Sequence, residues 1–363
     1  MSSFIEMIEN ITPDIYESLK LAVEIGKWSD GRKLTQEQRE LSLAGADRLG
    51  SAEPAGRPAH WLHGAAGMRL QIGTSAQYPV QIGCYSLIEI GRGAVNKMSA
   101  RQDDTSYVQY AFRLGETEIA VNPLIGKTLR LEFLGAIHCS HCGRKTKSSY
   151  SQGYCYPCML KLAQCDLCIM SPEKCHHDQG TCRDPAWGEQ FCMTDHIVYL
   201  ANSSGVKVGI TRSTQLPTRW LDQGASQALP ILRVATRQQS GFVEDLLRSQ
   251  VADRTNWRAL LKGDAQPVDL KAIRQELFDS CGAGLLGLQE RFGLQAIQLL
   301  HDAEPVEFRY PVEAYPTKIV SFNLDKNPIA EGTLLGIKGQ YLIFDTGVIN
   351  IRKYTAYQLA VHQ

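Results

Sequence analysis

The distribution of cysteine constrains this chain more than any other feature. Nine of the 11 cysteines lie between Cys139 and Cys192, in a sequence of 363 residues. Disulfide frameworks typically occur in short secreted domains. Here the cysteines form closely spaced pairs, and the N-terminus lacks the basic start and apolar run of a secretory signal. The pattern therefore predicts thiolate ligands for metal ions in a reducing compartment, and we expect a cytoplasmic protein.

Two Cys-x-x-Cys pairs, Cys139/Cys142 and Cys155/Cys158, are separated by twelve residues. Two knuckles at this separation can hold four thiolates at about 2.3 Å around one tetrahedral zinc ion. Thiolates also bind iron–sulfur clusters, but this spacing is typical of zinc ribbons. Because protein ligands would fill every position around the ion, we expect a structural role rather than a catalytic one.

A second group of cysteines follows directly, with histidines at positions 176, 177 and 196 nearby. From it we predict a second zinc ion bound by Cys165, Cys168, Cys175 and Cys182. Alternatives stay open, because ligands of the two ions can interleave and because an iron–sulfur cluster also suits these residues. Cys192 is either a further ligand or a buried thiol.

The segment after the cysteines predicts a β-hairpin. An apolar run at His196–Leu200 precedes turn residues at Asn202–Gly205, and a second strand pattern follows at Val206–Ile210. Alternation along the second strand places Lys207 and Gly209 on the same face. Lysine is unusual inside such a strand, and Gly209 leaves room above the sheet.

This hairpin and the residues after it resemble the GIY-YIG nuclease superfamily. The first motif corresponds to Ile197-Val198-Tyr199 and the second to Lys207-Val208-Gly209, where a lysine replaces the second tyrosine. Arg219 falls where the family has an arginine on the next helix. The resemblance implies this catalytic set: Tyr199, Lys207, Arg219, Glu244 and Asn256.

The chemistry of such a set is phosphodiester cleavage. Glu244 would hold Mg²⁺ or Mn²⁺ against a phosphate oxygen, and Arg219 would stabilise charge on the phosphoryl group. Tyr199 and Lys207 would orient or deprotonate the attacking water, with Asn256 in support. The alternative is structural: Tyr199 is then a core residue of the sheet, and Arg219 and Glu244 lie on a solvated helix face or form a plain salt bridge.

A broader resemblance covers roughly residues 88–363. Motifs that include Cys139–Gly143, Gly153–Cys158, Cys182–Pro185, Lys207–Arg212 and Gly336–Tyr341 resemble the bacterial family called domain of unknown function 2797. The family supplies no activity. Residues 4–43 separately resemble domain of unknown function 1315, through segments such as Tyr16–Lys20 and Gly26–Trp28.

These patterns predict an α+β multidomain chain. The predicted parts are a helical unit (1–48), a linker (49–87), a β-rich unit (88–137), a double metal-binding cysteine region (138–195), a GIY-YIG-like α/β module (196–262), a helical segment (263–304) and a C-terminal β-barrel or sheet (305–363).

We therefore expect a zinc-stabilised protein directed at nucleic acid, with metal-dependent nuclease activity. The net charge is zero, so phosphate contacts must come from local patches such as Arg144, Lys145 and Lys147. No segment has the apolar length of a membrane span. The alternatives are a non-catalytic module that binds RNA or DNA and a protein-interaction scaffold.

Overall fold

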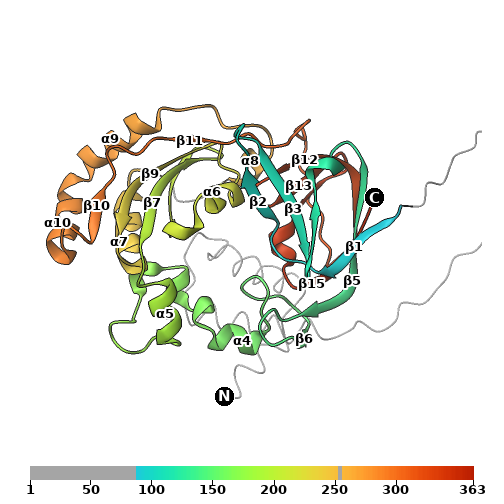
Figure 1. Ribbon diagram of the computed structural model, residues 1–363, viewed down its shortest axis with the longest axis horizontal. Coiled ribbons are helices and arrows are strands. Elements are labelled where there is room, and N and C mark those ends of the chain that lie inside the picture. Colours follow the sequence, from blue (N-terminus) through green and yellow to red (C-terminus); the bar gives the residue numbers. More distant parts are fainter. Residues whose placement is uncertain (1–86, 252–255) are drawn as a thin grey trace, which may run out of the picture. The chain divides into compact units, whose positions relative to one another are not determined.

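The computed structural model describes residues 87–251 and 256–363 (Figure 1). The predicted helical unit 1–48 and nearly all of the predicted linker 49–87 lie outside these residues. The described part is a mixed α+β structure with several antiparallel sheets and short helices. None of its helices is long and apolar enough to cross a membrane.

The largest sheet joins strands from both ends of the described chain. Its order is β1 (Glu89–Ala94), β15 (Tyr357–His362), β5 (Thr128–His138), β12 (Ile329–Lys338), β13 (Tyr341–Phe344) and β14 (Val348–Asn350), with β6 (Lys145–Thr146) paired to β5. Leu131 of β5 faces Val361 of β15, so the predicted units 88–137 and 305–363 form one sheet rather than two separate bodies. The chain between β5 and β12, which contains the cysteine region and the sheet with the hairpin, therefore lies outside this sheet apart from β6.

A small meander packs into the same core. It consists of β2 (Ser99–Gln102), β3 (Val108–Leu114) and β4 (Thr117–Ala120). Alternate residues of β3 are buried, as expected for a strand with one face on a core. Its buried residues, such as Phe112, join the core of the large sheet.

The predicted hairpin is confirmed and lies in another sheet. Its order is β10 (Ile297–Leu299), β9 (Gln227–Val234), β7 (His196–Asn202) and β8 (Val206–Arg212), and β11 (Val306–Glu307) also pairs with β9. Every residue of β7 is buried, because β7 has a neighbouring strand on each side and a hydrophobic core on each face. Strand β8 forms the edge of this sheet.

Helices cover both faces of the hairpin sheet. On one face, Val198 and Val208 share a core with α7 (Arg237–Leu247), α9 (Leu270–Ser280) and α10 (Gly282–Phe292). On the other face, Tyr199 packs against Trp220 of α6 (Thr218–Asp222), within the core that extends to the large sheet. The hairpin therefore connects two hydrophobic cores.

The remaining elements are short. They are α4 (Tyr156–Lys161), α5 (Pro185–Phe191), α8 (Trp257–Leu260) and the 3₁₀ turns η1 (Asn122–Leu124), η2 (Ala163–Cys165), η3 (Leu167–Ile169), η4 (Pro172–Lys174), η5 (Ser213–Gln215) and η6 (Ile351–Tyr354). Between β6 and β7 the described chain has such turns, short helices and one isolated bridge between Tyr150 and Tyr154. A segment of this kind buries too little apolar surface to order itself, so it calls for other constraints, such as metal ions.

Candidate metal centre and polar pocket

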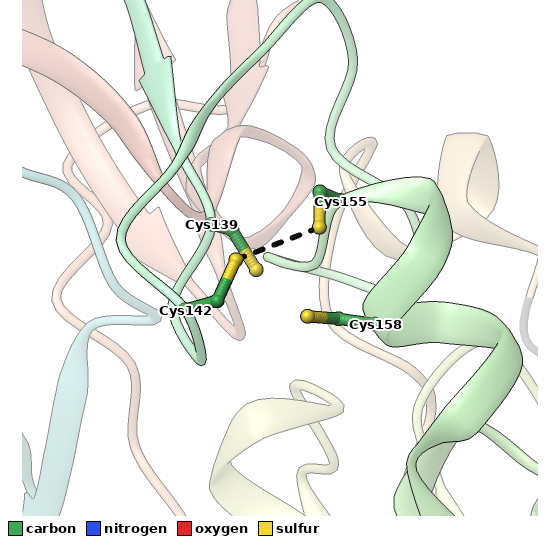
Figure 2. Close-up of side chains that lie close together, drawn as sticks. All are labelled: Cys139, Cys142, Cys155 and Cys158. Carbon is green, nitrogen blue, oxygen red and sulfur yellow. Dashed lines mark hydrogen bonds between the residues drawn. The ribbon is translucent and has the colours of Figure 1, made fainter.

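The four cysteines of the first predicted site come together, as Figure 2 shows. Cys139 follows the end of β5, and Cys142 lies on the tight turn that leads into β6. Cys155 precedes α4, and Cys158 lies in its first turn. The four sulfur atoms lie within 4.8 Å of one another, with 3.7 Å between Sγ of Cys142 and Sγ of Cys155.

Backbone hydrogen bonds hold the two knuckles in this arrangement. The turn is closed by bonds from Gly143 N to Cys139 O and from Cys139 N to Arg144 O, both 2.9 Å long. Gly143 adopts φ +70°, which glycine reaches without the strain of a side chain. Ser140 N donates to Gly153 O at 2.7 Å and ties one knuckle to the other. Short-range geometry therefore preforms the cluster.

The electrostatics of the cluster favour a cation. Burial raises the pKa of Cys139, but backbone N–H groups of Cys142, Cys155 and His141 more than offset it and bring the pKa to about 6. Burial and the neighbouring thiols raise the pKa of Cys158 to about 12. Four thiolates so close together repel one another, and a divalent ion removes that repulsion. The cluster can hold zinc.

The second predicted ligand set is not assembled in the same way. Among the described residues, the other group close enough to share one ion is Asp166, Cys168 and His176. The thiol of Cys165 instead lies beside Ser151, near Cys139 of the first cluster. A second zinc ion at Cys165, Cys168, Cys175 and Cys182 therefore stays a prediction.

A polar pocket of about 400 Å³ lies along the edge strand β8. Three residues of the predicted catalytic set line it: Lys207 on β8, Arg219 on α6 and Glu244 on α7. Lys207 is only 6% exposed. The wall of the pocket also includes Ile169–Glu173, from the cysteine region. Residues far apart in the sequence thus meet at one hollow.

Tyr199 lies beneath this pocket. Its side chain is fully buried under Gly209, where an added Cβ would lie 2.8 Å from the tyrosine hydroxyl oxygen. Gln223 Nε2 donates to that hydroxyl at 2.9 Å, and Arg219 also bonds to it. Burial raises the pKa of Tyr199 although the charge of Arg219 opposes the rise, so the group is a neutral hydroxyl at neutral pH.

Sequence reasoning missed further pocket residues: Gln223, Arg237 and Arg248. The two arginines, together with Lys207 and Arg219, bring four cationic side chains to the pocket, and Glu173 and Glu244 bring two carboxylates. Buried atoms of three of these side chains have no hydrogen-bond partner within the described chain: Nε of Arg219, Nε of Arg237 and Oε1 of Gln223. The two arginine N–H groups are unsatisfied donors and favour an anionic ligand. No sequence motif marks Arg237 or Arg248. They reach the pocket only because α7 packs against β8.

Asn256 lies elsewhere. Its side chain accepts hydrogen bonds from the backbone N–H groups of Arg258 and Ala259 at 3.1 Å, and so caps α8. Its own backbone N–H donates to Ser204 Oγ in the hairpin turn. It is not among the residues that line the pocket. The basic residues Arg144, Lys145 and Lys147 are all exposed, beside the first cluster.

The structure thus defines the class: a cysteine-rich α+β protein with a four-cysteine cluster that can bind zinc, next to a polar pocket. Residues 126–359, well over half of the chain, match the model of the family described as "Protein of unknown function (DUF2797)". The chain belongs to this family.

Residues 5–46 match a second model, "Protein of unknown function (DUF1315)". Over 38 residues the chain is 49% identical to "Uncharacterized protein YeaC" of Escherichia coli (strain K12), a stretch that is 10% of this chain and 42% of that protein. The chain therefore spans less than half the length of this relative. No solved structure matches the chain.

Proposed function

We propose that this protein is a zinc-stabilised, metal-dependent phosphodiesterase of the GIY-YIG type that cleaves nucleic acid in the cytoplasm. The observation that carries the proposal is the pocket at β8, where Lys207, Arg219 and Glu244 meet. Each residue alone is common on protein surfaces. Together they combine a carboxylate for a divalent ion with cations for a phosphate.

The order of elements supports the same proposal. A hairpin (β7 and β8) is followed by a helix with Arg219, a third antiparallel strand (β9) and a helix with Glu244. Strand β7 lies between the other two. This is the order in which the GIY-YIG superfamily carries its hairpin, arginine and glutamate.

The surroundings of each residue suggest its role. The carboxylate of Glu244 is the group that would hold Mg²⁺ or Mn²⁺, which supplies Lewis acidity toward a phosphate oxygen. Arg219 binds the phosphate, and Arg237 and Arg248 add positive charge around it. The neutral hydroxyl of Tyr199 holds the Arg219 side chain, and Lys207 orients the attacking water. Asn256 contributes by capping α8 rather than by contact with the substrate.

Cleavage of labelled nucleic acid tests this proposal. Purified protein is incubated with labelled pools of DNA and of RNA, with Mg²⁺, with Mn²⁺ and with EDTA. We expect cleavage that requires the divalent ion and falls at least about 100-fold in Glu244→Gln, because a metal-binding carboxylate is lost. The matched control is Glu290→Gln, at an exposed glutamate on α10 that should leave activity unchanged.

The excess of positive charge in the pocket also favours a second function, binding of nucleic acid without cleavage. In that case the protein retains DNA or RNA, with an affinity that falls steeply as salt increases, and no product appears with any metal. Arg219→Ala would then weaken binding, whereas Glu244→Gln would not. Absence of both cleavage and binding refutes both proposals and leaves a protein-interaction scaffold.

A further inference from the structure

Three cysteine-bearing segments meet at the first turn of α7. The backbone N–H of Arg237 donates to Cys192 O at 2.8 Å. The guanidinium of Arg237 donates to Ile169 O, next to Cys168, at 2.6 Å. The side chain of Gln238 donates to Cys175 O at 2.9 Å. Two consecutive residues of one helix thus fix the backbone beside Cys168, Cys175 and Cys192.

Cys182 is connected to the same region, the first turn of α7, through helix α5. A Cβ on Gly188 would lie 3.4 Å from Sγ of Cys182, so that thiol rests on the helix. The carbonyl of Gly188 accepts from Cys192 N at 2.7 Å, one helical turn further on. Burial raises the pKa of Cys168, and the charges of Asp166, Cys175, Cys192 and Cys182 raise it further, so these thiols lie in its neighbourhood.

Asp166 and His176 lie within 4.8 Å of Cys168, but each already has one partner among the neighbouring side chains. The carboxylate of Asp166 accepts from Arg183 Nε at 2.6 Å, and His176 Nδ1 lies 2.8 Å from Thr181 Oγ1. Cys165 lies beside Ser151, on the side of the first cluster. Cys281 belongs to the apolar core beneath α9 and α10. These contacts leave Cys168, Cys175, Cys182 and Cys192 as the remaining cysteines of this region, with the ring of His177 beside Cys182 at Gly188.

We propose that Cys168, Cys175, Cys182 and Cys192 bind a second structural zinc ion. Four thiolates complete a tetrahedral zinc shell, as in the first cluster. The four sulfur atoms are not all within 4.8 Å of one another here, but each thiol turns about a single side-chain bond, and the backbone around them is fixed. This set replaces Cys165 of the predicted set with Cys192. The proposal depends only on the cysteines and does not require the pocket to be active.

The ion would order one wall of the polar pocket. The segment Ile169–Glu173 lies between Cys168 and Cys175 and lines the pocket. It packs tightly on α7, where a Cβ on Gly241 would lie 2.5 Å from Glu173 N and 2.8 Å from Pro172 Cβ. A metal ion that clamps Cys168 and Cys175 therefore holds this wall from both of its ends.

Alkylation of the metal-loaded wild-type protein tests the ligand set without any substitution. Cys165, Cys168 and Cys182 are all partly exposed, so burial alone predicts similar reactivity toward iodoacetamide. We expect mass spectrometry to find Cys165 modified while Cys168 and Cys182 are protected, until a chelator releases the metal. The exposed Cys142 of the first cluster is the positive control for protection by zinc. Modification of Cys168 and Cys182 at the rate of Cys165, or protection of Cys165 with them, overturns the proposal.

Metal content gives an independent measurement. We expect two zinc ions per wild-type chain and one in Cys175→Ser and in Cys192→Ser, by elemental analysis and native mass spectrometry. Cys165→Ser and Cys281→Ser should keep two. Two ions in Cys192→Ser, or one in the wild type, refutes the site, and iron in place of the second zinc refutes the assigned metal. Where a variant does not fold, the alkylation pattern of the wild type decides.

Discussion

Substitution of Gly209 by alanine tests the packing beneath the polar pocket. A Cβ at this position would lie 2.8 Å from both Cζ and the hydroxyl oxygen of Tyr199. Ordinary carbon contacts are about 3.5–4.0 Å, so the ring must move by roughly 1 Å. The ring cannot move freely, because it is fully buried and packs edge-on against Trp220, with 5.9 Å between ring centroids.

The expected cost follows from these contacts. Overpacking of a filled core costs about 1–3 kcal/mol, and loss of the hydrogen bond from Gln223 to the Tyr199 hydroxyl adds about 1 kcal/mol. We therefore expect Gly209→Ala to lower the free energy of unfolding by about 2–4 kcal/mol. The displaced hydroxyl also releases Arg219, so binding of an anionic ligand in the pocket should weaken.

Urea unfolding at a fixed zinc concentration measures this cost. The control is Gly287→Ala on α10, where an added Cβ meets nothing within 4 Å, and there we expect a gain of about 0.5–1 kcal/mol. In a Tyr199→Leu background the obstructing ring is absent, so Gly209→Ala should cost less than about 0.5 kcal/mol. Wild-type stability of Gly209→Ala, or an equal cost in both backgrounds, would show that the clash with Tyr199 is not the cause.

Three further predictions concern other parts of the molecule. Cys142→Ser should lower the zinc content by one ion per chain, measured by elemental analysis, and destabilise the protein by several kcal/mol, measured by thermal unfolding. Because Cys142 is exposed, a loss of packing alone would cost far less. Burial lowers the pKa of His196 to about 4, so the contribution of His196 to the free energy of unfolding is fully present above pH 6.5 and falls by about 3 kcal/mol as the pH decreases to 4. Urea titrations across this pH range should show the decrease in the wild type and not in His196→Asn. Asp264→Asn removes the carboxylate that lies 2.8 Å from the buried Nζ of Lys338, and should cost about 2–3 kcal/mol in urea unfolding, whereas an unchanged midpoint would mean that Lys338 does not depend on this charge.

Local patterns in the sequence predicted local structure well. The apolar run at His196–Leu200, the turn residues and the strand at Val206–Ile210 specify a hairpin, because short-range pairing depends on neighbouring residues. The first cysteine cluster is also mostly a matter of spacing, since each knuckle is a tight turn. Both features appear where the sequence predicted them.

Long-range pairing was beyond the sequence patterns. The contact of Leu131 with Val361 joins segments on opposite sides of the cysteine region, and no local signal specifies that partner. The predicted division into separate β-rich units therefore missed their common sheet. Cys192 was ambiguous for the same reason: its relation to Cys168 and Cys175 depends on contacts with α7.

The pocket distinguishes what the sequence alone specifies from what depends on the tertiary structure. Residue types and chain order by themselves determined the thiolate cluster, the hairpin and the membership of a family. Only the tertiary structure decided that Arg237 and Arg248 join Arg219 and Glu244, and that Ile169–Glu173 forms their wall. The physical reason is that metal knuckles and hairpins form from residues close in sequence, whereas a pocket forms where separate elements pack, and its charges depend on the faces that they bury.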